Sequence, residues 1–235
     1  MTDPLITRVE PLRPRGLRVL LHLDRGEPFE VTLEALERSR LGLGDQLPNT
    51  TRHALLDSDA DIRIRDAALN LISYRARTRT ELERRLRQKG FRPARIGPCL
   101  DRLGEKGFID DGAVAAAFIR DRLRHRPRGK ARLSSELHAK GVDRDLAREV
   151  IDRVFHDEEV SDEQLAHDVA EQWMSRQSES VLQALGSDER SPERDKARRR
   201  LHAFLSRRGF RGQELTQATS EVLASARRRV SPKRD

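Results

Sequence analysis

Leu82-x3-Leu86-x3-Gly90-Phe91 is a stretch that recurs twice in this chain, as Leu133-x3-Leu137-x3-Gly141-Val142 and as Leu201-x3-Leu205-x3-Gly209-Phe210. Apolar residues spaced four and then three positions apart lie on one helix face, and this spacing follows the glycine of each of the three copies. The positions concerned are Ile96, Leu100 and Leu103, then Ala147, Ile151 and Val154, then Leu215, Thr219 and Val222. A pattern repeated in this way marks stacked supersecondary units. We therefore predict an all-α fold of tandem repeats of three-helix units in an elongated array.

Signals for helix ends define the first repeat. Thr78 followed by Glu81 is typical of a capping box, in which both side chains accept backbone N–H groups at a helix start. Gly90 suits the left-handed position that ends a helix, because it has no Cβ atom. A third helix is expected over residues 93–106, where Pro98 either kinks the helix or delays its start.

The later repeats carry breaks of their own. The second opens after Asp110-Asp111 and is interrupted at Pro127-Arg128-Gly129. The third opens near Ser161, and a polar insertion at about residues 175–196 is either an extended helix or a flexible excursion. The predicted boundaries are residues 58–109 for the first repeat, 110–160 for the second and 161–235 for the third.

The first 57 residues follow a different pattern. Residues 17–23 and 28–32 are rich in apolar, β-prone side chains, and Asp24, Gly26 and Pro28 supply the turn between the two runs. This pattern predicts a β-hairpin, followed by a short helix over residues 33–39. An isolated hairpin is marginal in water, so we expect it to pack on the first helical repeat or to pair with another strand.

Composition excludes several classes of protein. No apolar run approaches the roughly 20 residues that span a bilayer, and no signal peptide is evident, so we expect a cytoplasmic protein with no membrane contact. The single cysteine, Cys99, excludes an internal disulfide framework and a cysteine-based zinc site. Phosphate-binding glycine motifs are missing too. We predict no enzyme activity, no cofactor and no metal site.

Charge indicates the kind of partner. The chain has 47 basic and 39 acidic residues and a formal net charge of +8. Such a balance favours a polyanion or an acidic protein groove as partner, although an arginine-rich genome composition gives the same excess. The basic residues gather in three runs, at residues 77–95, 120–132 and 194–211.

The repeats and their connections resemble the RecX family, regulatory proteins that modulate the RecA recombinase. The resemblance is carried by motifs in chain order: Ala68-Leu69-x-Leu71-Ile72-x-Tyr74-Arg75-x-Arg77-Thr78-x-x-Glu81-Leu82, Gly107-Phe108-Ile109-Asp110-Asp111, Arg128-Gly129-Lys130-x-Arg132-Leu133-x-x-Glu136-Leu137-x-x-Lys140-Gly141-Val142, and Arg208-Gly209-Phe210. It spans about residues 60–228. The insertion and the β-containing segment depart from the family's common repeat core.

This resemblance implies a helical modulator that lies in the groove of the RecA–DNA filament and mainly inhibits it. It would limit filament growth, ATP hydrolysis and strand exchange, act as a monomer, and bind free DNA weakly and without sequence preference. The alternative is a helical DNA-binding transcriptional regulator. The candidate RecA- or DNA-binding residues are Tyr74, Arg75, Arg77, Lys89, Arg122, Arg124, Arg126, Arg128, Lys130, Arg132, Lys140, Arg207 and Arg208.

Overall fold

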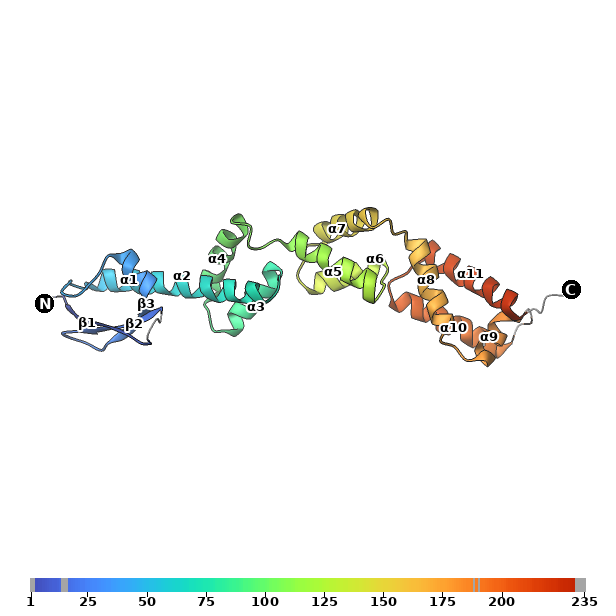
Figure 1. Ribbon diagram of the computed structural model, residues 1–235, viewed down its shortest axis with the longest axis horizontal. Coiled ribbons are helices and arrows are strands. Elements are labelled where there is room, and N and C mark those ends of the chain that lie inside the picture. Colours follow the sequence, from blue (N-terminus) through green and yellow to red (C-terminus); the bar gives the residue numbers. More distant parts are fainter. Residues whose placement is uncertain (1–2, 14–16, 188, 190, 231–235) are drawn as a thin grey trace. The chain divides into compact units, whose positions relative to one another are not determined.

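The structure is a computed structural model that describes residues 3–13, 17–187, 189 and 191–230. It confirms the predicted fold class: the chain is mostly helical, with three-helix repeats behind a small β-containing segment (Figure 1). Two compact units divide the chain, Met1–Asp110 and Asp111–Asp235. None of the helices in the described ranges is long and apolar enough to cross a membrane.

The segment that precedes the repeats is a three-stranded antiparallel sheet, one strand more than the predicted hairpin. The hairpin is β2 (Arg18–Leu23) paired with β3 (Phe29–Thr32). The additional strand, β1 (Ile6–Pro11), pairs with the other side of β2, in the order β1-β2-β3. The short helix α1 (Leu33–Ser39) follows as predicted. The hairpin therefore does pair with another strand.

The sheet also packs on a helix, α2 (Asn49–Tyr74). This helix is much longer than the opening helix expected from the sequence. Leu55 and Ile62 of α2 lie in one core with residues of β2, β3 and α1. Ile64 and Ala68, further along α2, lie in the core of the first repeat. One helix thus serves two cores, and residues 57 and 58, where the sequence placed a boundary, lie inside it.

The first repeat is completed by α3 (Arg79–Gln88) and α4 (Pro93–Glu105). The Thr78 hydroxyl accepts a hydrogen bond from the Glu81 backbone N–H at 3.1 Å, which confirms the predicted cap. Gly90 ends α3 with a φ of +86°, in the left-handed region. Since α4 begins at Pro93 and continues through Pro98, the internal proline does not delay the helix start.

The second repeat consists of α5 (Asp111–His125), α6 (Lys130–Ala139) and α7 (Arg144–Asp157). The predicted apolar face is buried here as well: Leu133 and Leu137 of α6 pack in one core with residues of α5 and α7. The break at Pro127 separates α5 from α6, so the two helices meet through a short loop that carries Arg126 and Arg128.

The third repeat has four helices rather than three: α8 (Asp162–Met174), α9 (Glu179–Gly186), α10 (Pro192–Arg207) and α11 (Gly212–Val230). The additional helix α9 lies in the predicted polar insertion, of which residues 188 and 190 are outside the described part. Leu185 of α9 is fully buried in the same core as residues of α8, α10 and α11. Part of the insertion is therefore an element of the core.

Candidate interaction surface

Part of the positive charge in the first basic run is balanced by acidic residues of the protein itself. Arg79 forms an ion pair with Asp101 at 2.8 Å. Arg95 contacts both Asp57 and Asp61 of α2, the latter at 3.0 Å. Exposed pairs of this kind contribute at most about 1 kcal/mol to stability. They show that a basic run in the sequence overstates the positive charge that a partner meets.

The candidate residues of the first repeat divide into two groups. Arg75 forms an ion pair with the buried Glu81 at 3.1 Å, and the Arg77 Nε donates to the Leu71 carbonyl at 3.0 Å. Both arginines hold the turn between α2 and α3. Tyr74, at the end of α2, is 78% exposed, and Lys89 is exposed at the end of α3. Only these two present their polar groups mainly to solvent.

In the second repeat, two candidate arginines converge on one carboxylate. Glu136 of α6 accepts from the Nε of Arg122 at 3.0 Å and from the Nε of Arg132 at 2.9 Å. Burial by itself raises the pKa of Glu136, but the hydrogen bonds from Arg122 and Arg132 outweigh it and the pKa is lowered. Glu136 therefore fixes the orientation of the two guanidinium groups.

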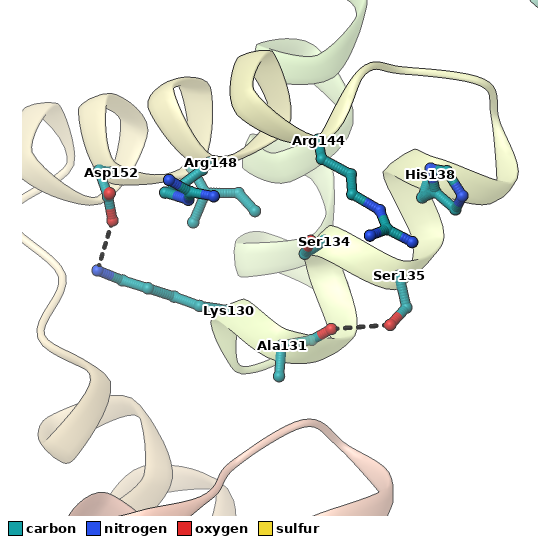
Figure 2. Close-up of a pocket in the computed structure, with 9 residues that line it drawn as sticks. Lys130, Ala131, Ser134, Ser135, His138, Arg144, Arg148 and Asp152 are labelled. Atoms are coloured by element: carbon teal, nitrogen blue, oxygen red, sulfur yellow. Dashed lines mark hydrogen bonds and ion pairs between the residues drawn. The ribbon is translucent and has the colours of Figure 1, made fainter.

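Two candidate lysines contact aromatic rings of the second repeat. Lys130 binds Asp152 of α7 at 2.9 Å, as Figure 2 shows, and its ammonium lies 5.0 Å from the centre of the Phe155 ring. It also approaches Asp162 of α8 at 3.6 Å. Lys140 lies over the Phe118 ring at 5.1 Å. Lys130 therefore links the second repeat to the third, a packing role that the sequence did not indicate.

The second and third repeats meet closely at a pair of glycines. The Gly129 N–H donates to the Arg208 carbonyl at 3.0 Å, and a Cβ atom on Gly129 would lie 2.7 Å from the Gly209 carbonyl oxygen. Arg208, at the end of α10, donates to the Pro127 carbonyl at 3.4 Å and covers the Phe204 ring at 4.6 Å. This contact brings the end of α10 against the loop that opens α6.

Three guanidinium groups gather at this contact, those of Arg128, Arg176 and Arg208, which we call the junction arginines. Burial lowers the pKa of Arg208, and the charges of Arg128 and Arg176 lower it further. Arginine nevertheless stays protonated in proteins, so the repulsion persists. The Nε of Arg128 is buried and forms no hydrogen bond with any described residue. An anion bound here would relieve both the repulsion and the missing hydrogen bond.

The sequence missed Arg176, because this residue lies in the polar insertion, outside the three basic runs. Three further candidates, Arg124, Arg126 and Arg207, are exposed. Within the described ranges they form no ion pair and no side-chain hydrogen bond. Guanidinium groups like these and the junction arginines are suited to phosphate or carboxylate groups. The contact of each candidate residue with RecA or DNA is a prediction.

The described residues contain no group of three or more histidine, cysteine or acidic side chains that could hold a metal ion. Cys99 is buried in the core of the first repeat, and burial raises the pKa of its thiol. A thiol with a raised pKa is a weaker nucleophile at neutral pH.

Comparison with known families adds an independent line of evidence. The family model for the first three-helix domain of RecX matches residues 65–103, and the model for its second three-helix domain matches residues 110–151. These two segments lie within the first and second repeats described above.

Individual relatives and solved structures agree. Regulatory protein RecX of Halorhodospira halophila is 32% identical over 157 residues, which cover 67% of this chain and 86% of the relative. That of Mycolicibacterium vanbaalenii is 32% identical over 190 residues, 78% of this chain and 96% of the relative. A crystal structure of regulatory protein RecX superposes with a TM-score of 0.67 at 19% identity and covers 94% of this chain and 99% of the other. At that identity it shows the fold alone.

Proposed function

Because this chain belongs to the RecX family of regulatory proteins, we propose that it modulates the RecA recombinase, mainly as an inhibitor. Members of this family are regulators and not enzymes, so the effect has to come from binding. The protein binds in the groove of the RecA–DNA filament as a monomer in the cytoplasm. It thereby limits filament growth, ATP hydrolysis and strand exchange.

The observation that carries this proposal is the cluster of positive charges at the contact of the second and third repeats. The junction arginines repel one another, and Arg124 and Arg126 extend into solvent nearby in the sequence. A RecA–DNA filament offers DNA phosphates and acidic protein side chains, and guanidinium groups bind both with paired hydrogen bonds. The exposed arginines set the association rate and the orientation, and the half-buried ones contribute to affinity.

The test is RecA-catalysed ATP hydrolysis on single-stranded DNA with and without the protein. Wild-type protein should suppress hydrolysis. The double variant Arg124→Glu with Arg126→Glu should inhibit at least tenfold more weakly, because two exposed charges facing the partner are reversed. Its thermal midpoint should stay close to that of the wild type, since exposed substitutions typically change stability by less than about 0.5 kcal/mol each.

A matched control reverses the same amount of charge elsewhere. Arg102 and Lys106 are exposed at the end of α4 and lie outside the three basic runs. Arg102→Glu with Lys106→Glu should inhibit RecA within about twofold of the wild type. Equal loss of inhibition in both double variants would mean that net charge alone acts. Unchanged inhibition by the Arg124/Arg126 variant would refute this surface as the contact.

A further inference from the structure

A pocket with charged and hydroxyl side chains in its wall opens on the second repeat between α6 and α7, and of its residues only Lys130 is among the candidate contacts named above. Its volume is about 420 Å³. Three cationic side chains line it, together with a histidine and two serines (Figure 2). Lys130 and Asp152 form an ion pair at one end. The other end is lined by Ser134 and His138 of α6 and by Arg144 of α7.

The donors at this second end are not committed to other groups. Figure 2 shows the Arg144 guanidinium reaching from α7 towards the turn of α6 that carries Ser134, with His138 beside it. In the described part of the chain, neither Arg144 nor His138 forms a side-chain hydrogen bond or an ion pair. The Asp143 carboxylate next to Arg144 is already used as a cap, since it accepts the Asp145 N–H at 2.8 Å.

A second guanidinium stands one helical turn further along α7. Arg148 lines the same pocket, and its ion pair with Asp145 at 3.3 Å joins two largely exposed side chains, 75% and 87% accessible to solvent. Exposed pairs of this kind hold their geometry weakly, so Arg148 is able to turn towards an anion. Arg144 and Arg148 lie at positions i and i+4, which project from the same face of a helix.

We propose that this pocket binds a backbone phosphate of single-stranded DNA. A phosphate group presents oxygens in several directions, and the pocket supplies guanidinium, hydroxyl and imidazole groups from two helices. Such a mixed set is typical of phosphate contacts, which arginine, lysine and hydroxyl side chains make without reading the base sequence. A carboxylate of an acidic protein is planar and is better matched by one guanidinium fork.

The pocket is separate from the junction arginines in its residues, so the two proposals stand on different observations. DNA binding through the pocket is measured without RecA. A failure of the pocket proposal therefore leaves the proposed regulation of RecA untouched, and a failure to inhibit RecA leaves the pocket proposal untouched.

The experiment measures binding of the full chain to a fluorescently labelled 30-nucleotide oligo(dT) by anisotropy across a series of salt concentrations. Arg144→Ala with Arg148→Ala should weaken binding about tenfold at 50 mM salt. It should also reduce the slope of log affinity against log salt by about 1, the loss expected when one phosphate contact disappears. Circular dichroism checks that the variant stays folded.

The matched control removes two exposed arginines outside the pocket, Arg102→Ala with Arg153→Ala. It should bind oligo(dT) within about twofold of the wild type. Equal weakening in both double variants, or no weakening in the pocket variant, would overturn the site. A third measurement follows the His138 ring by NMR: inorganic phosphate should shift its signals saturably. If oligoglutamate shifts them at lower concentration than oligo(dT), an acidic protein segment and not DNA occupies the pocket.

Discussion

Single atoms decide the contact between the second and third repeats. Gly209 has a φ of +94°, and a Cβ atom there would lie 2.4 Å from the Cβ of Arg132. Two separate requirements therefore meet at one residue: a left-handed backbone and the absence of a side chain. At Gly90, which ends the corresponding helix of the first repeat, φ is +86° but a Cβ atom would meet no atom within 4 Å. The two glycines test the two requirements separately.

We expect Gly209→Ala to destabilise the protein far more than Gly90→Ala. The Gly90 variant meets only the left-handed strain of an alanine, about 1–2 kcal/mol. The Gly209 variant adds a clash with Arg132, and overpacking typically costs a further 1–3 kcal/mol. Urea unfolding followed by circular dichroism measures both free energies of unfolding. Equal losses in the two variants would contradict the close approach of the repeats.

The sequence predicted the left-handed position of Gly209 but not its contact with Arg132. A helix end is a local property, written in the few residues around it, whereas the contact joins two repeats far apart in the chain. The same limit applies to the candidate site. The sequence of the α5–α6 loop did not reveal that Lys130 is held by Asp152 and Asp162, because neither acid lies in the loop.

Glu136 should make stability depend on pH. Its pKa is lowered in the folded protein, so its contribution is fully present above its ordinary pKa of 4.5 and is lost as pH falls below that value. At pH 7, Glu136→Gln should lower the free energy of unfolding by about 2 kcal/mol, the scale of hydrogen bonds to charged groups. The difference from wild type should shrink as pH is taken from 5 to 3. Chemical denaturation at each pH measures it.

The control is Glu149→Gln on α7. Glu149 is 67% exposed and pairs with Arg153 at 3.3 Å, so its replacement should change stability little at any pH. A difference between Glu136→Gln and wild type that is constant from pH 7 to pH 3 would show that the carboxylate charge contributes nothing and that only its shape matters.

At the scale of elements, β1 and α9 are the two that the sequence did not resolve. β1 is a six-residue edge strand that ends at Pro11, and a proline is tolerated there because an edge strand needs only one row of hydrogen bonds. Its short and partly polar sequence gave no clear alternation. α9 has eight residues, too few for helical periodicity to stand out from a serine- and acid-rich surrounding. Helices with a clear apolar face, such as α3 and α6, were predicted for the opposite reason.

The position of Leu185 gives α9 a measurable role. This side chain is fully buried in the core of the third repeat, so Leu185→Ala removes packing and leaves a cavity. Such substitutions typically cost about 2–5 kcal/mol. Gln183→Ala, on the exposed side of the same helix, should stay within about 0.5 kcal/mol. Thermal unfolding compares them. Equal midpoints would mean that α9 is detached from the core in solution.

At the scale of the whole molecule, the formal net charge differs from the positive charge that is free to contact a partner. The chain carries 47 basic and 39 acidic residues, and many of the basic ones are paired on the surface, such as Arg120 with Glu158 at 2.7 Å and Arg79 with Asp101 at 2.8 Å. Cations that are paired in this way are less available to a polyanion than the formal charge suggests. We therefore expect any affinity for DNA to grow with the number of phosphates that the exposed cations neutralise, and not with the formal charge of +8.

This difference predicts how the protein binds free DNA. If about four phosphates are contacted on a duplex, the slope of log affinity against log salt is about −3.6, and affinity falls roughly 100-fold between 50 and 200 mM salt. Two duplexes of unrelated sequence should bind within about threefold of each other, because contacts to phosphate carry no sequence information. Anisotropy titrations at several salt concentrations measure both quantities.

Tight binding to one duplex at 200 mM salt, in the presence of a nonspecific competitor, would contradict this expectation. It would favour instead a transcriptional regulator that reads bases with a helix in the major groove, since base contacts survive the salt that screens phosphate contacts.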